Sequence, residues 1–465
     1  MAKSAETALC VMKRCDVALV AFIDGGVIII GVVVDGSCSS GEIVVVNVSN
    51  CRYEVVRSAA KSAGWRVEED EDEYDALVAD ATAGTAAAAP ATRTAHQQAV
   101  ILRHHHAYAR ARTREPWNVY WTDTSVSSQR AMRLERFQRL NHFPGMYHLA
   151  RKGGLGKHLT QLAKLFPSDF SFFPQTWVLP QQWSEFKERI ESGKGNRTFI
   201  IKPDASCQGK GIFLTRTHEN VNPTESQVAQ RYLHKPLLID GFKFDMRIYV
   251  ILTSVDPLRI FLFEDGLVRI CTQKYVEPRG RNLQKSRMHL TNYAINKESE
   301  DFVFNEATSD PGTGNKRSLR WFWGWLEEQH GKDARDGFVA ETHDMIIKSI
   351  ISVLPQLRHI YRSCVKHPGP SNCFEILGFD VLMDRKFKPW LIEVNHSPSF
   401  ACDTPLDTDI KSRLIAKTMA LIGVHASDKR KSRQRLKKDA QSRLYGATAP
   451  KSRRRLQYDG ASTES

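Results

Sequence analysis

Residues 377–399 constrain the fold more than any other part of the sequence. Two apolar runs flank a polar turn at residues 385–386, a pattern that predicts a β-hairpin. Because side chains alternate between faces with a period of two, Glu393 and Asn395 share a face of the second strand, and a tight turn brings Asp380 to that face. Two carboxylates and an amide oxygen are typical Mg²⁺ ligands when substrate phosphates complete the set. The surrounding apolar residues disfavour the alternative, a plain polar sheet face, so the hairpin predicts a metal site.

The chain has 465 residues, enough for two to four domains, and a formal net charge of +14. Such a charge favours an acidic partner: nucleic acid, an anionic membrane or an acidic protein surface. The nine cysteines are scattered and form no Cys-x-x-Cys pair. This distribution indicates reduced thiols in the cytosol and argues against a disulfide framework and a zinc site.

Two stretches differ in composition from the rest of the chain. Residues 17–34 are almost wholly apolar, as in a membrane anchor, but Asp24 and two glycines interrupt their centre, where an acidic side chain is costly in hydrocarbon. We expect two short strands or an irregular extension there. Residues 68–116 pass from an acidic run to Ala/Thr-rich low complexity and an Arg-rich patch. They predict a disordered insertion, in which the histidines at 104–106 are solvated rather than metal-bound.

Periodicity outlines the rest of the chain. Residues 43–46 predict a strand and residues 51–64 a helix. Regular structure resumes at residues 117–121, and a helix-rich stretch runs through Leu165. Mixed strands and helices then continue to about Gly423.

A lysine- and glycine-containing loop follows the strand predicted at residues 198–202. Lys202 ends that strand, Pro203 breaks it, and residues 208–211 read Gln-Gly-Lys-Gly before a further strand. Glycines let the backbone approach a ligand and offer N–H groups to anionic oxygens. The loop is not a Walker A motif, which ends in Gly-Lys-Ser/Thr and precedes a helix. It predicts a phosphate site of another type, although an ordinary glycine-containing hairpin has a similar sequence.

A second motif alternates strictly. Lys243, Asp245 and Arg247 point to one face of a predicted strand, with apolar residues between them. This pattern fits either a structural ladder of ion pairs or the wall of a polyphosphate site. The next strand adds Arg269, and a polar turn follows at residues 289–293.

Together these motifs resemble the tubulin tyrosine ligase-like family, over roughly residues 42–66 and 117–425. Within the family the chain is most similar to the polyglutamylases, in the branch that extends glutamate chains. The motifs that carry the resemblance are Lys-Phe-Asp-x-Arg at 243–247, His-Leu-Thr-Asn-Tyr at 289–293, Gly-Phe-Asp at 378–380 with Pro-Trp-Leu-Ile-Glu-Val-Asn at 389–395, Asn-His-Phe-Pro-Gly at 141–145 and Phe-Pro-Gln-Thr-Trp-Val-Leu-Pro at 173–180.

The resemblance implies an α/β (α+β) fold of the ATP-grasp type, in which two sheets clamp ATP. The implied division has an unassigned extension at 1–41, an N-terminal domain at 42–149 with the insertion at about 68–116, a central ATP-grasp domain at 150–236, a C-terminal ATP-grasp domain at 237–425 and a basic tail at 426–465.

Site residues carry over by position. The resemblance implies a catalytic or positioning group of Lys243, Asp245 and Arg247, and no general base stands out. The implied ATP contacts are Lys202, Gln208, Gly209, Lys210, Gly211, Gln230, Arg231, Tyr232, Leu233, Lys243, Asp245, Thr291 and Asn292. The implied Mg²⁺ ligands are Asp380, Glu393 and Asn395, in agreement with the hairpin.

For the substrates, the resemblance implies that Arg269 grips the amino acid and that Lys411 is a further contact. Initiating members of the family tend to carry Arg where this chain has Gln208 and an apolar residue where it has His396. We therefore expect these two residues to border the acceptor, with a purely structural hydrogen bond as the alternative for His396. This difference predicts chain elongation rather than branch initiation.

The implied function is ATP- and Mg²⁺-dependent ligation of free L-glutamate to glutamate side chains or chains on tubulin tails, through an acyl phosphate. We expect a monomer in the cytoplasm and on the cytoskeleton, at the axoneme or basal body of a cilium or flagellum, with no membrane partner. The basic surface lacks the interleaved aromatic residues of a single-strand binder, so no nucleic acid is expected. The alternatives are ligation of glycine or tyrosine, a non-tubulin acceptor, and a non-catalytic microtubule-binding protein.

The tail from residue 428 to residue 455 is dense in Lys and Arg, with Leu436 and Leu444 as its main apolar residues. A helix that is polar all round cannot pack into a core. The segment is either a solvated terminus with an import-like patch or a docking helix for an acidic polymer. The resemblance favours the second, a microtubule-binding segment.

Overall fold

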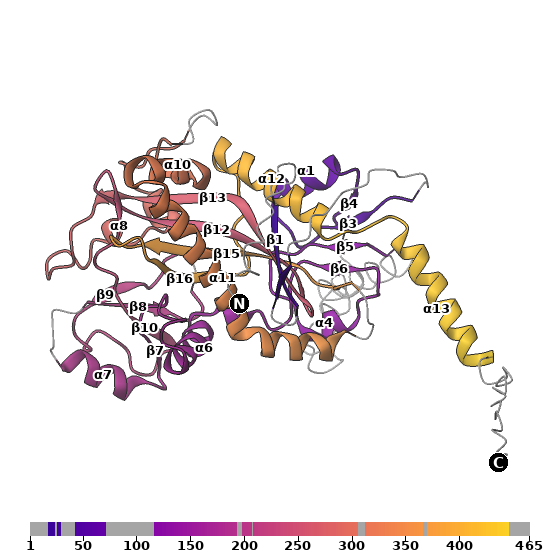
Figure 1. The fold of residues 1–465 in the computed structure, drawn as a ribbon, viewed down its shortest axis with the longest axis horizontal. Coiled ribbons are helices and arrows are strands. Elements are labelled where there is room, and N and C mark those ends of the chain that lie inside the picture. The colour runs from indigo at the N-terminus through magenta and orange to yellow at the C-terminus, as the bar shows by residue number, and fades with distance from the viewer. Residues whose placement is uncertain are drawn as a thin grey trace, which may run out of the picture.

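The computed structural model describes residues 17–23, 26–28, 42–70, 116–192, 198–206, 208–305, 312–365 and 370–445. Helices and strands are mixed, and three sheets organise them (Figure 1). The α/β prediction is confirmed. The domain boundaries stay predictions, and the predicted insertion with its histidines lies outside the described residues apart from its flanks.

Four short strands between residues 45 and 140 form a small parallel sheet. Its strand order is β4-β3-β5-β6, with the bounds β3 Val45–Asn47, β4 Arg66–Glu68, β5 Val119–Tyr120 and β6 Arg139–Leu140. The accompanying helices are α1 Glu54–Ser62, α4 Ser128–Met132 and α5 Tyr147–Ala150. The strand and helix predicted at 43–46 and 51–64 are therefore present, each slightly shorter or shifted.

A four-stranded antiparallel sheet follows and lies below the large sheet in Figure 1. Its order is β7-β10-β8-β9, with the bounds β7 Thr176–Leu179, β8 Phe199–Pro203, β9 Phe213–Thr215 and β10 Gln227–Arg231. Helices α6 Lys152–Leu165 and α7 Trp183–Glu191 accompany it. Trp177, Phe186 and Phe199 form the centre of a separate core beneath this sheet.

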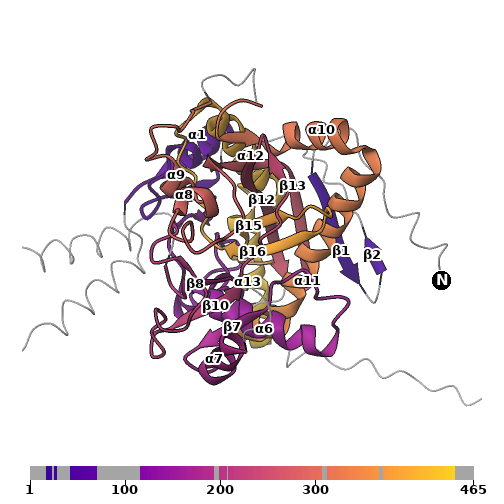
Figure 2. The ribbon, with the colours of Figure 1, turned by 90° about the vertical axis from the view of Figure 1, so that its left-hand side faces the viewer.

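The large sheet has the order β16-β15-β12-β13-β1-β2, and short strands β11 and β14 pair with β12 and β13. Its bounds are β1 Val17–Ile23, β2 Gly26–Ile28, β11 Leu238–Ile239, β12 Phe242–Val255, β13 Leu258–Lys274, β14 Lys316–Ser318, β15 Glu375–Met383 and β16 Pro389–Asn395. The two short strands expected in the apolar N-terminal stretch are present as β1 and β2, beyond β13 at one edge (Figure 2).

Strand β12 shows why this sheet can hold a site. Its even-numbered residues from Phe244 to Leu252 pack into one core with α10 and α11, while Tyr249 and Ile251 enter a second core with α12 and α1. The odd face therefore changes from charged residues at 243–247 to apolar residues further along. The helices not yet given are α8 Ser286–His289, α9 Tyr293–Asn296, α10 Leu319–His330, α11 Lys332–Cys364 and α12 Pro405–Leu421.

Helix α13, Asp428–Tyr445, projects away from the body (Figure 1). Almost all of its residues are exposed, Ser432 being a buried exception near its start. In the part of the chain that the structure describes, no helix is both long and apolar enough to cross a membrane.

Candidate active site

The β15–β16 hairpin brings the three predicted metal ligands together. Asp380 and Glu393 are paired across the two strands, and Asn395 lies opposite Gly378. The Asn395 amide nitrogen is 3.2 Å from Glu393 Oε1 and 3.4 Å from Asp380 Oδ2. The convergence predicted from the period of two is confirmed.

Two arginines fix Asp380: Arg247 from the adjacent strand β12 and Arg269 from β13, the next strand beyond it. Arg247 binds it with Nε and, at 3.0 Å, with Nη2, and Arg269 Nη2 lies 2.9 Å from Asp380 Oδ2. Arg269 also makes a bidentate pair with Asp245, at 2.7 and 2.6 Å. Burial alone raises the pKa of Asp380, but the two guanidinium groups hold it well below its usual range. Asp380 is therefore an anion that stays charged.

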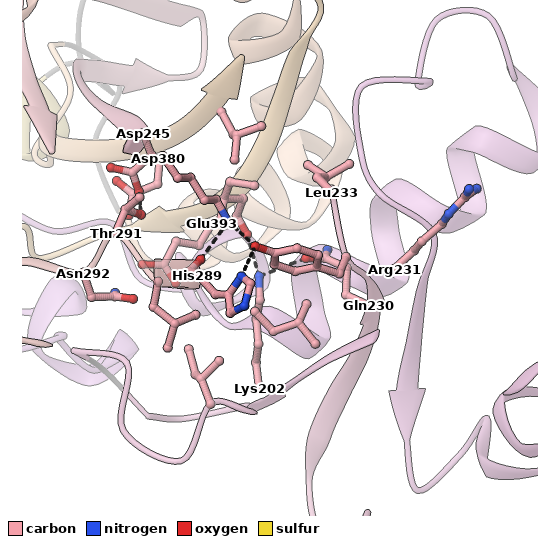
Figure 3. Close-up of a pocket in the computed structure, with 17 residues that line it drawn as sticks. Lys202, Gln230, Arg231, Leu233, Asp245, His289, Thr291, Asn292, Asp380 and Glu393 are labelled. Atoms are coloured by element: carbon pink, nitrogen blue, oxygen red, sulfur yellow. Dashed lines mark hydrogen bonds between the residues drawn. The ribbon is translucent and has the colours of Figure 1, made fainter. Parts of the chain in front are cut away.

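A cleft of about 630 Å³ opens between the small antiparallel sheet and the large sheet. Figure 3 shows labelled side chains reaching into it from both sides, Lys202 from β8 and Asp380 with Glu393 from the hairpin. Of the predicted residues, the following line it: Lys202, Gln230, Arg231, Tyr232, Leu233, Lys243, Asp245, Thr291, Asn292, Asp380 and Glu393.

Two lysines in this cleft are buried, and among the described residues all their hydrogen-bond partners are neutral. Lys202 Nζ donates to Gln230 Oε1 at 2.9 Å and to the Ile392 carbonyl at 3.5 Å. Lys243 Nζ donates to the Tyr232 hydroxyl at 3.0 Å and to the His289 carbonyl at 2.7 Å. Burial lowers the pKa of each lysine to about 8. Two buried ammonium groups without a hydrogen-bonded carboxylate indicate a site built for an anionic ligand.

The remaining wall of the cleft is apolar and aromatic. Ile200, Ile212, Leu290, Leu382 and Ile392 line it, which suits the flat face of a base. The side chains of the predicted adenine hinge differ in direction. The Tyr232 hydroxyl is buried and lies 3.0 Å from His289 Nδ1. The Arg231 side chain points away from the cleft (Figure 3). Of that hinge, we therefore expect the Arg231 backbone rather than its guanidinium to contact a ligand.

The glycine loop lies at the edge of the cleft rather than in its wall. Gln208 and Gly209 both have positive φ, 60° and 80°. A Cβ at Gly209 would lie 2.5 Å from the Ile295 side chain and 3.2 Å from Asn292 Oδ1, so glycine is needed for this close approach. Lys210 is exposed, and Gly211 also has positive φ, at 71°. Gly209 therefore lies against Asn292, which lines the cleft.

The predicted substrate residues lie beside the cleft and form two groups. Arg269 is engaged by the two aspartates above, and Lys411 lies 2.7 Å from Asp407. His396 lines a second cavity, of about 420 Å³, where its Nε2 is 2.6 Å from the Ser125 hydroxyl. Burial lowers the pKa of His396 to about 4, so it is neutral at physiological pH. The cleft therefore does not bring His396 and Lys411 into contact with the predicted ATP residues.

The donor set fits Mg²⁺ bound together with phosphates. Within the described ranges no three His, Cys, Asp or Glu side chains cluster as a metal site, and the hairpin supplies two carboxylates and one amide. Such a set leaves coordination positions for phosphate oxygens and water, as Mg²⁺ prefers. The Asn395 amide presents its nitrogen to the carboxylates here, so a half-turn of that amide would present its oxygen to an ion.

Comparison with known proteins decides the family. The model of the tubulin-tyrosine ligase family matches residues 129–433. The chain belongs to the tubulin-tyrosine ligase family. It is 43% identical over 419 residues to tubulin polyglutamylase TTLL13 of Mus musculus, which covers 89% of this chain and 46% of the relative.

Two further relatives agree. Human tubulin polyglutamylase TTLL6 is 42% identical over 83% of this chain and 38% of its own length. A probable beta-tubulin polyglutamylase of Tetrahymena thermophila is 47% identical over 66% of this chain and 26% of its own length. The chain thus spans less than half the length of these relatives.

Three further residues lie at this site although the sequence predicted no role for them: Lys152, His289 and Lys316. Lys152 Nζ is 3.8 Å from Glu393 Oε2 and donates to the Ser206 carbonyl at 2.8 Å. The His289 carbonyl accepts a hydrogen bond from Lys243, and His289 Nδ1 is 3.0 Å from the Tyr232 hydroxyl. Lys316 Nζ lies 2.6 Å from Asp407 Oδ2. Lys152 immediately precedes Gly153 and Gly154, and this Lys-Gly-Gly sequence was the available signal.

Proposed function

We propose that this chain is an ATP- and Mg²⁺-dependent ligase that joins glutamate to carboxylates of an acidic tubulin tail. The observation that carries the proposal is the cleft, which Lys202, Lys243, Asp380 and Glu393 line together, with Asn395 beside the two carboxylates. Buried cations on one side and metal-binding oxygens on the other match a Mg²⁺–polyphosphate complex. Its base would lie against the apolar wall.

Each group has a role that its position supports. Lys202 and Lys243 would bind phosphate oxygens and stabilise charge that develops during phosphoryl transfer. Asp380, Glu393 and Asn395 would hold Mg²⁺, which when bound neutralises phosphate charge. Arg247 and Arg269 keep Asp380 ionised and oriented. Asp245 positions Arg269 and accepts from the Thr291 hydroxyl at 2.6 Å.

The reaction proposed is carboxylate activation followed by amine attack. A carboxylate oxygen of the acceptor bonds to the γ-phosphorus of ATP as ADP leaves, which gives an acyl phosphate. The amine of the incoming amino acid then bonds to the carbonyl carbon, phosphate leaves, and the amine loses a proton. The fixed cations of the cleft would stabilise the negative charge of both steps, since they need no reorganisation.

A cluster of cations beside the cleft supports glutamate as the incoming amino acid. Arg269 and Lys316 are paired across β13 and β14, and Lys316 and Lys411 share Asp407 at 2.6 and 2.7 Å. Burial lowers the pKa of Lys316 although Asp407 opposes this effect. Two buried lysines that share one carboxylate, beside Arg269, suit a substrate with two carboxylates better than glycine or tyrosine, which carry one.

The acceptor proposal rests on charge and on the relatives. The relatives named above are tubulin polyglutamylases or a probable one, and α13 offers an exposed basic helix for an acidic tail. Gln208 and His396 favour elongation of existing glutamate chains, as their resemblance to elongating members implies. With this acceptor the protein would act in the cytoplasm on the cytoskeleton, including ciliary microtubules, and we propose that it does so as a monomer.

Mass spectrometry of purified microtubules tests this function. The protein is incubated with microtubules, ATP, Mg²⁺ and either glutamate, glycine or tyrosine, and tail peptides are weighed. Glutamate-sized increments that require ATP support the proposal. Increments of glycine or tyrosine would replace it with a ligase of different specificity. Microtubule binding without any increment would leave only a binding protein.

A further inference from the structure

A third cavity, of about 760 Å³, lies at the junction of the small parallel sheet, the large sheet and the end of α12. It shares no lining residue with the ATP cleft. Arg139 enters it from β6, Asp256 and Arg259 from the β12–β13 turn, and Leu421 with Ile422 from α12 and its C-cap.

Arg139 is a buried cation with unused donors. It is 5% exposed, and its Nη1 donates to the Arg136 and Gln138 carbonyls, both at 3.1 Å. Within the described part of the chain, its Nε and Nη2 make no hydrogen bond and no carboxylate pairs with it. Burial lowers the pKa of Arg139 although the charge of Asp428 opposes this effect. A buried guanidinium without a directly paired carboxylate is costly unless a ligand supplies one.

The rest of the lining favours an anion. Asp256 is already paired with Arg358 at 3.6 Å and with Arg362 at 2.5 Å, so it does not neutralise Arg139. The hydroxyl of Ser254 and the exposed Arg259 add further donors, whereas the Ser371 hydroxyl already donates to the Cys373 carbonyl at 2.7 Å. Phe374, Pro257, Leu421 and Ile422 form an apolar side. A charged end and an apolar side together suit a carboxylate on a short methylene stem.

We propose that this cavity binds a glutamate side chain of an acidic peptide, as a docking site outside the ATP cleft. Ile422 lines the cavity and α13 begins at Asp428, so one extended acidic segment can contact both the cavity and the basic helix. The site anchors the substrate protein through a single buried charge pair. That the peptide is a tubulin tail rests on the proposed function; that it carries carboxylates does not.

Fluorescence anisotropy with a labelled, end-capped hexaglutamate peptide tests the site on the full chain at low salt. Arg139→Met, which removes the charge but keeps much of the volume, should weaken peptide binding about tenfold, the equivalent of one charge pair. Arg139→Lys should keep part of the affinity. The control Lys386→Glu reverses an exposed charge at the hairpin turn and should change the affinity far less. ATP affinity should be unchanged in all three variants.

Unchanged peptide binding in a folded Arg139→Met protein would overturn the proposal, and so would an equal loss in Lys386→Glu, which would indicate general electrostatics. If Arg139→Met does not fold, the variant Arg259→Glu at the exposed rim tests the site instead. Its affinity for the peptide should fall several-fold. An affinity equal to that of Lys386→Glu would overturn the proposal. Arg139-dependent binding without any ligation in the microtubule assay would refute the proposed function and leave the docking site intact.

Discussion

Basic residues occur in two very different settings, the cleft lined by Lys202 and Lys243 and helix α13. In the cleft, Lys202 and Lys243 are buried and each is held by two hydrogen bonds. In α13, eight Lys and Arg residues stand against two Asp residues, and nearly all are exposed. The first setting fixes a few charges in place, and the second offers many that water and salt screen.

The difference predicts how each region responds to change. A buried charge interacts strongly at short range, so the loss of one group in the cleft should have a large effect. An exposed charge contributes through a field that salt screens over about 10 Å at 0.1 M, so single changes in α13 should matter little and their sum more.

The largest effect is expected at Glu393. Glu393→Gln removes one charge from the proposed Mg²⁺ site with little change in volume, so glutamate incorporation should fall on the order of a hundredfold to a thousandfold. Thermal unfolding should be almost unchanged. The control Glu191→Gln alters a half-exposed carboxylate on α7 that pairs with Lys187 and should keep full activity. Normal turnover of Glu393→Gln at saturating Mg²⁺ would refute the metal assignment.

The lowered lysine pKa predicts that ATP binding takes up protons. In the free protein the pKa of Lys243 is about 8, so above that pH it is largely neutral, and a bound polyphosphate would favour its charged form. ATP affinity should therefore fall as pH rises through about 8, by up to tenfold per pH unit for each such group.

Calorimetry in buffers of different ionisation enthalpy measures this uptake. At pH 8.5 we expect net proton uptake on ATP binding, and at pH 6.5 almost none, because both lysines are already charged. Lys243→Met should reduce the uptake at pH 8.5. Equal uptake at the two pH values would show that the lysines do not contact the phosphates.

A smaller effect is expected for the choice of acceptor. If Gln208 and His396 border an acceptor chain, pre-branched tail peptides should be turned over about tenfold better than unmodified ones, a difference of about 1.4 kcal/mol. His396→Ile should reduce this preference and leave ATP affinity unchanged, because His396 lines the second cavity and not the cleft. Equal turnover of both peptides by the wild-type chain would refute elongation but not ligation.

The parts of the site that the sequence revealed are those set by local periodicity. The convergence of Asp380, Glu393 and Asn395 follows from a hairpin whose strands are adjacent in sequence, and Lys243 and Asp245 follow from alternation along β12. Family resemblance added Gln230, which the structure places 2.9 Å from Lys202, the lysine at the end of the strand before the glycine loop.

The parts that the sequence did not reveal depend on contacts between distant segments. Lys152 meets Glu393 and Lys316 meets Asp407 across many residues, and no local period connects them. The position of β1 between β13 and β2 is of the same kind, because β13 lies far from β1 in the sequence. Arg139 gave no signal, because an arginine at the end of a two-residue strand predicts exposure unless the surrounding cavity is known.

The smallest effect on catalysis is expected at α13, and it tests the exposed side of the contrast. Deletion of residues 428–465 removes a helix for which the structure shows a 3.6 Å pair of Arg430 with Glu42 and a buried Ser432 near its start, so the body should remain folded. Cosedimentation with microtubules should weaken several-fold, and its dependence on salt should flatten because fewer screened charges remain. Turnover of a short glutamylated peptide should change less than twofold, since the cleft and hairpin are intact.

Replacing the α13 lysines with glutamine should give an intermediate loss of microtubule binding if the sum of charges matters. Cosedimentation that the deletion leaves unchanged would show that α13 is only solvated, and the contrast between the two regions would then rest on the cleft alone.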